Sequence, residues 1–109
     1  MSGRPSDEIE PVAEEPRRRR IDAGALHVGA LEYGPPDARP VVMTHGLADS
    51  AWSLDRLARS LSDRYRVISL DLRGHGMSDW GAYTLPHFVG DLVGVCEALE
   101  LDRPLMLGH

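Results

Sequence analysis

The sequence predicts an α/β fold in which a β-hairpin is followed by a strand, a helix, a strand, a helix and a strand. Three largely apolar segments, at residues 41–43, 67–72 and 104–107, are predicted to be buried strands, and the continuous apolar run at 41–43 is typical of a strand covered on both faces of a parallel sheet. Helical periodicity occupies the intervals between these segments. Because strands that alternate with helices form right-handed crossovers, we expect a mostly parallel sheet with helices packed on its faces.

The chain has 109 residues, enough for one small domain. Acids, proline and serine dominate its first sixteen residues, which therefore cannot bury enough apolar surface to offset their ordering entropy. We expect a flexible tail at residues 1–17 and a partial α/β domain at 18–109. The arginines at 17–20 are predicted to be a solvated segment, with contact to an anion or a partner as the alternative. Their expected counter-charges are Asp7, Glu8, Glu10, Glu14 and Glu15.

The local patterns predict each further element in turn. Two short segments flanking Ala23-Gly24 indicate a hairpin from about residue 18 to 33. A first helix, capped by Asp49 or Ser50, is predicted from apolar residues at helical spacing, which are Leu54, Leu57, Ala58 and Leu61.

A second helix is predicted from Thr84 to Leu99, with Thr84 as its cap and Pro86 in its first turn. One side of this helix is apolar and is expected to be buried. Cys96 lies on that side, so we expect it to be a buried, unreactive thiol. The members of the apolar side are Phe88, Leu92, Val95, Cys96 and Leu99.

Composition excludes several classes of protein. The net charge of −5 argues against nucleic-acid partners, because phosphate binding requires a basic face. No apolar run reaches the roughly 18 residues that span a bilayer, and the N-terminus lacks the apolar core of a secretory signal. The expected compartment is therefore the cytoplasm, without membrane association.

Histidines follow each buried strand, and they raise the question of a metal site. His45, His75 and His109 all come at predicted strand ends, with Asp71 and Asp79 nearby. Their spacing matches no zinc pattern such as H-E-x-x-H. We therefore expect loop-shaping and hydrogen-bonding roles and no metal.

Three motifs at these strand ends resemble those of the α/β-hydrolase family. The chain has "HG" at 45–46 after one strand, "DLRGHGMSD" at 71–79 after the next, and "GH" at 108–109 after the third. In that family the corresponding pattern is HG, then D-x-R-G-H-G-x-S-D, then G-H-S-x-G. The resemblance covers about residues 20–109 and implies the N-terminal part of an α/β-hydrolase fold.

The resemblance also implies a reaction and its residues. The family's nucleophile, usually serine, follows Gly-His at a strained turn, and its acid and histidine come later in the chain. We therefore expect an inactive N-terminal fragment that ends at the start of the nucleophile turn, Gly108-His109, and lacks nucleophile, acid and base. One oxyanion donor maps onto the backbone N–H of Leu47, supported by His45 and Gly46.

The expected substrate is a small molecule with an ester or related carbonyl group, and no cofactor is implied. Ala48 stands where epoxide-opening members commonly have proline, which disfavours epoxide hydrolysis and leaves esterase, lactonase, C–C hydrolase and perhydrolase chemistry open. Trp52 could line a substrate pocket or pack against the first helix. Two alternatives remain, which are a non-catalytic half-domain that pairs with another chain and an unrelated flavodoxin-like anion-binding domain. The sequence carries no signal for an oligomeric state.

Overall fold

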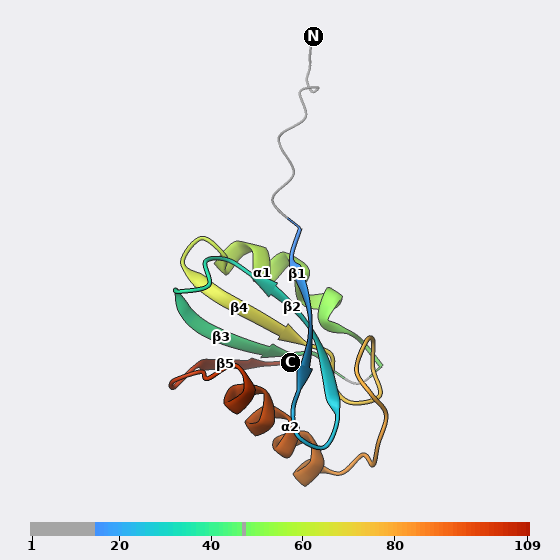
Figure 1. The fold of residues 1–109 in the computed structure, drawn as a ribbon. Helices are drawn as coiled ribbons and strands as arrows, with labels where there is room; N and C mark the ends of the chain where they lie inside the picture. Colours follow the sequence, from blue (N-terminus) through green and yellow to red (C-terminus); the bar gives the residue numbers. More distant parts are fainter. Residues whose placement is uncertain (1–14, 47) are drawn as a thin grey trace.

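The computed structural model describes residues 15–46 and 48–109 and has five strands in one sheet. Figure 1 shows the two α-helices on opposite sides of this sheet. In chain order the elements are β1 (Arg17–Asp22), β2 (His27–Tyr33), β3 (Arg39–Thr44), a 3-10 helix η1 (Ala51–Leu54), α1 (Asp55–Leu61), β4 (Tyr65–Leu70), α2 (Leu85–Ala98) and β5 (Leu105–Gly108).

The sheet has the strand order β1-β2-β4-β3-β5. β1 and β2 form the predicted antiparallel hairpin, and β2 pairs antiparallel with β4. β3 lies between β4 and β5 and is parallel to both. The predicted α/β class is thus confirmed, with a mixed sheet in which β3, β4 and β5 are parallel.

Two apolar clusters hold the helices to the sheet. α2 covers a face built from alternate residues of the strands, including Val28, Val42 and Ile68, with Val95 of the helix fully buried among them. α1 and η1 cover the other face through Ala51 and Ala58. Because side chains alternate along a strand, the consecutive apolar residues of β3 serve both clusters.

The predicted cap Thr84 is confirmed, whereas Ser50 caps the short helix η1 and α1 begins after Leu54 without a side-chain cap. Ser50 accepts the Trp52 N–H at the start of η1, and the Thr84 hydroxyl accepts the His87 N–H at the start of α2. Within α2, a Cβ at Gly94 would lie 2.0 Å from the carbonyl oxygen of Ala23. Glycine at this position therefore lets the helix approach the β1–β2 turn closely.

Two predicted strands differ from those in the structure. The predicted third buried strand is the edge strand β5 (Leu105–Gly108), and its Leu105 and Met106 are 40% and 53% exposed. The physical reason is that β5 pairs only with β3, and the described residues leave its outer side uncovered. The strand predicted at 67–72 is Tyr65–Leu70, because residue 71 already begins the following loop.

Cys96 is partly buried rather than fully buried, and burial, followed by the charge of Glu97, raises the pKa of its thiol. Most of the predicted tail, residues 1–14, lies outside the described residues, and Arg17 is the first residue of β1. Among the described helices, none is long and apolar enough to cross a bilayer.

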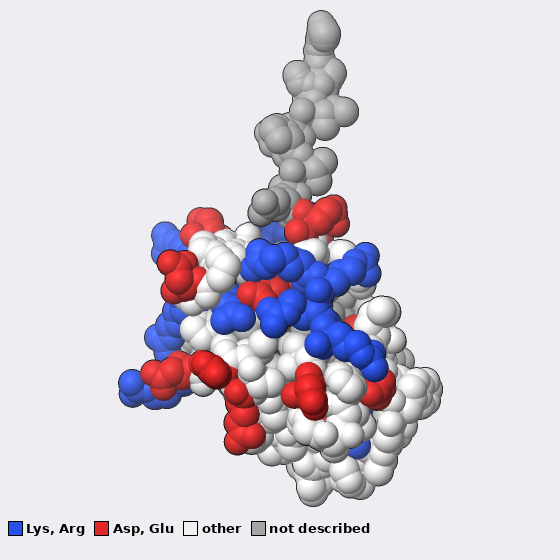
Figure 2. All heavy atoms as spheres, viewed as in Figure 1, with Lys and Arg blue, Asp and Glu red and all other residues white. Residues whose placement is uncertain are grey.

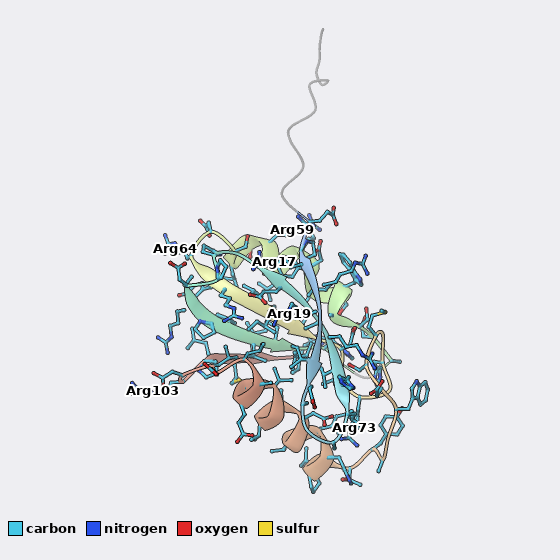
Figure 3. All side chains as sticks on the ribbon, viewed as in Figure 1. Arg17, Arg19, Arg59, Arg64, Arg73 and Arg103 are labelled. Carbon is cyan, nitrogen blue, oxygen red and sulfur yellow. The ribbon has the colours of Figure 1, made fainter. Side chains whose placement is uncertain are left out.

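The arginines of β1 find their counter-charges in the fold. Glu32 of β2 is only 2% exposed and forms ion pairs with Arg17, Arg19 and Arg66. Figure 2 shows this cluster as blue side chains around a red centre, and Figure 3 shows Arg17 and Arg19 over the sheet. Burial opposes ionisation of Glu32, but the hydrogen bond and charge of Arg66, with the other two arginines, lower its pKa.

Candidate functional site

The carboxyl ends of β3, β4 and β5 meet at one edge of the sheet. Thr44, the last residue of β3, is paired with Leu70 of β4 and with Gly108 of β5. The loops that follow these strands therefore start side by side. In open α/β sheets this is the edge at which ligands bind.

His109 lies directly against the β3 loop. Its backbone N–H donates to the carbonyl oxygen of Thr44 over 3.1 Å. A Cβ placed on Gly46 would lie 3.5 Å from Nδ1 of His109. Gly108 is the last residue of β5 rather than part of the turn, so the chain leaves the sheet at His109, beside Gly46.

His45 ties the β3 loop to the β4 loop. Its ring is 3% exposed, and Nε2 accepts the backbone N–H of Leu72 over 3.0 Å. Because Nε2 is an acceptor, the ring proton is on Nδ1, which donates to the carbonyl oxygen of Gly46. Both ring nitrogens of His45 are therefore occupied by loop backbone.

His75, which belongs to the loop after β4, forms a second link back to the loop after β3. Its Nδ1 donates to the carbonyl oxygen of Arg73 over 3.0 Å, and its Nε2 accepts the backbone N–H of Ala48 over 3.1 Å. The rings of His45 and His75 are 5.0 Å apart. The tie holds Ala48 with φ at 62°, a left-handed conformation that alanine adopts at an energetic cost.

Asp71 holds the loop after β4, residues 71–79, through hydrogen bonds to backbone N–H groups. Its carboxylate is buried and accepts the backbone N–H of Ala51 over 2.7 Å and that of Met77 over 3.0 Å. Gly76 passes so close to it that a Cβ there would lie 2.4 Å from the carboxyl carbon, and its φ is 50°. Only glycine fits this turn without strain.

Arg73 anchors the same loop to α2. Its guanidinium donates from Nε and Nη2 to the two carboxylate oxygens of Asp91, each over 2.8 Å, and from Nη1 to the carbonyl oxygen of Ala82. Figure 3 shows Arg73 between the loop and the helix. Both side chains are buried, and the hydrogen bond to Asp91 raises the pKa of Arg73. This bidentate pair fixes the position of α2 relative to the loop.

A hollow of about 600 Å³ opens next to these ties. Ala48 and His75 line it together with Trp80 and Tyr83 of the segment that precedes α2. Tyr83 stacks on Phe88 with ring centroids 6.2 Å apart, so its ring packs against the first turn of α2. Trp80 is 76% exposed.

The structure brings together four of the predicted site residues, which are His45, Gly46, Gly108 and His109. Leu47, the predicted oxyanion donor, lies outside the described residues. Trp52 does not line the hollow at His75. Its ring instead lies against the guanidinium of Arg18 on β1, 5.2 Å from ring centroid to Cζ.

Sequence reasoning did not find Asp91. An acid on the otherwise apolar side of a predicted helix is the signal that could have identified it, because a buried carboxylate requires a partner. Within residues 15–46 and 48–109, no group of three or more His, Cys, Asp or Glu side chains is placed to hold a metal ion.

Comparison with known proteins assigns the family. Residues 39–109 match the model of the alpha/beta hydrolase fold family, and the chain belongs to that family. A serine hydrolase-like protein of Danio rerio is 36% identical over 81 residues, which cover 71% of this chain and 25% of the relative. Epoxide hydrolase A of Mycobacterium tuberculosis is 30% identical over 99 residues, which cover 86% of this chain and 31% of the relative.

Among solved structures, an epoxide hydrolase from Vigna radiata superposes with a TM-score of 0.81 at 26% identity, covering 87% of this chain and 32% of its own. The chain thus spans about a quarter to a third of the length of these relatives.

Proposed function

We propose that this chain supplies the oxyanion side of a hydrolase site, and that the protein containing it hydrolyses a small ester or related carbonyl substrate. The nucleophile in this proposal is the residue after His109, and the backbone N–H of Leu47 is one donor to the developing oxyanion. The nucleophile attacks the carbonyl carbon and the oxyanion is stabilised. The C–O bond to the alcohol then breaks and the alcohol leaves with a proton, after which water cleaves the acyl–enzyme to the free acid and restores the nucleophile.

One observation carries the proposal. His109 donates to Thr44 and lies against Gly46, so a residue joined to its carboxyl side begins next to the loop that holds residue 47. A nucleophile and an oxyanion donor need this proximity, because the reacting carbonyl must contact both. The hydrogen bonds of His45 to Leu72 and of His75 to Ala48 link the loop after β3 to the loop after β4.

Epoxide opening is the competing reaction, because relatives that carry this name are similar to the chain. The conformation of Ala48 argues against it. Proline fixes φ near −65°, whereas Ala48 has φ at 62°, so the loop as it stands has no place for the proline common in epoxide-opening members. We therefore rank ester hydrolysis first.

The exposed apolar surface of α2 and β5 favours a second role, a non-catalytic half-domain that pairs with another chain. Val93 of α2 is 51% exposed and Met106 of β5 is 53% exposed. Apolar groups that line one hollow together are typical of interfaces.

The test is an assay of the protein encoded by the reading frame that contains this chain. Nitrophenyl butyrate and styrene oxide are offered separately, with the 109-residue chain as the matched control. We expect ester turnover that disappears when the residue after His109 is replaced by alanine, and no turnover by the 109-residue chain. Styrene oxide turnover without ester turnover would contradict the proposal, and no turnover of either substrate would favour the pairing role.

A further inference from the structure

A hollow of about 420 Å³ lies against the outer hairpin strand, away from the hollow at His75. Leu31 of β2, Met77 of the loop after β4 and Trp52 form its apolar lining. Arg18 and Arg20 of β1 line it as well. Arg18 is paired with Leu31 across the two strands, so both side chains are on the same face of the sheet.

Arg18 lies against the aromatic ring of Trp52. Its guanidinium carbon is 5.2 Å from the centroid of the Trp52 ring, within the range of a cation–π contact. A cation–π contact uses none of the guanidinium N–H groups as hydrogen-bond donors, so those of Arg18 remain available to a ligand. Among the described residues, no carboxylate lies within ion-pair distance of Arg18.

The other charges around the hollow are already engaged, and Arg19, which also lines it, is paired with Glu32. Arg20 pairs with Asp79 over 2.9 Å and also donates to the carbonyl oxygen of Met77. Asp71 is the carboxylate that lines the hollow, and its two oxygens accept backbone N–H groups while the residue is 5% exposed. The charge that remains available to a ligand is therefore the positive charge of Arg18.

We propose that Arg18, held by Trp52, is a carboxylate-binding residue, and that this hollow takes a small organic monocarboxylate with an apolar body. The carboxylate accepts two in-plane N–H groups of Arg18, and the apolar body lies on Leu31 and Met77. A charge-assisted bidentate contact supplies specificity for the anion, and burial of apolar surface supplies the rest of the affinity. This site is separate from the proposed ester-hydrolysing site.

Tryptophan fluorescence provides a direct test. Trp80→Phe leaves Trp52 as the only tryptophan, since the sequence has two. In this background we titrate sodium octanoate and, separately, octanol, which has the same apolar body without the charge. We expect a saturable change in fluorescence with octanoate and binding at least tenfold weaker with octanol.

Substitution of the arginine sharpens the test. Arg18→Gln should weaken octanoate binding about tenfold, and Arg18→Lys, which keeps the charge and loses the planar fork, should fall between. Arg56→Gln, which changes an exposed arginine of α1 outside the hollow, should leave affinity unchanged. Circular dichroism verifies that each variant is folded, and calorimetry of the unsubstituted protein repeats the titration.

Three results would overturn the proposal, which are no saturable octanoate binding, equal binding of octanol, or unchanged affinity in folded Arg18→Gln. None of these measurements involves turnover. Failure here therefore leaves the hydrolase proposal untouched, and failure of the ester assay leaves this one untouched.

Discussion

The loop after β4 (residues 71–79) and the apolar surface formed by α2 and β5 differ in the kind of side chain that they bury. The loop buries polar and charged groups, with Asp71, Arg73 and Ser78 all less than a tenth exposed and hydrogen-bonded. The β5–α2 surface exposes apolar groups such as Val93 and Met106. The buried polar groups of the loop therefore find their hydrogen-bond partners among the described residues. The apolar side chains of α2 and β5, by contrast, are left without a covering element there.

Disrupting the Arg73–Asp91 pair should have the largest effect on stability. Arg73→Met leaves a buried carboxylate without its partner and should lower the free energy of unfolding by about 3–5 kcal/mol, measured by urea denaturation. Arg103→Met, which removes a fully exposed pair with Asp102, is the control and should leave the denaturation midpoint unchanged. Equal effects of the two substitutions would mean that the loop is not anchored through Asp91.

Two glycine substitutions compare the loop with the helix. Gly76→Ala forces alanine to a φ of 50° and brings a Cβ within 2.4 Å of the Asp71 carboxyl carbon, so unfolding should become easier by about 1–3 kcal/mol. Gly90→Ala in α2 meets no atom within 4 Å and should stabilise the protein by about 0.5–1 kcal/mol. Thermal unfolding followed by circular dichroism measures both. Stabilisation by Gly76→Ala would contradict the described turn.

The Glu32 cluster predicts a dependence of stability on pH. Its folded-state pKa is lowered, so the unfolded chain binds the proton more tightly, and the stabilisation is present above about pH 4.5 and is lost as the pH falls through the folded value. Glu32→Gln should therefore flatten the loss of stability below this pH.

Glu97→Gln, which alters an exposed carboxylate of α2, serves as the control for that experiment and should retain the parent profile. The profiles are obtained from urea midpoints measured between pH 3 and pH 7. A Glu32→Gln profile that parallels the parent would contradict the proposed role of the arginines.

The smallest effect is expected at the β5–α2 surface. Val93→Thr together with Met106→Thr should change the free energy of unfolding by less than about 0.5 kcal/mol, because both side chains are half exposed. The same pair should reduce self-association of the 109-residue chain in sedimentation velocity, since less apolar surface is exposed. Strong destabilisation would mean that these side chains are more buried than described.

Much of the fold was predictable because hydrophobic periodicity reports strands and helices directly. The hairpin, the helix caps at Ser50 and Thr84, and the parallel strands all follow from local patterns. Exposure of β5 does not, because burial of a strand depends on its neighbours in the sheet. Its apolar sequence is the same whether it lies at an edge or in the centre.

The site was predictable to a different extent. The "HG" and "RGHG" motifs mark the loops, but the side-chain partners depend on packing between distant elements. Asp91 meets Arg73 only because α2 lies across the β4 loop, and Glu32 meets Arg17, Arg19 and Arg66 only because three strands align. The ring of Trp52 lies against Arg18, whereas the sequence left open whether it lines a pocket or packs against the first helix.

The hydrolase account is tested most directly by covalent labelling of the protein that contains this chain. A fluorophosphonate ester reacts with an activated serine, and peptide mass spectrometry then locates the adduct. We expect a single adduct on the residue joined to His109, and its loss when that residue is replaced by alanine. An adduct elsewhere in the protein, or ester turnover that survives the replacement, would contradict the account.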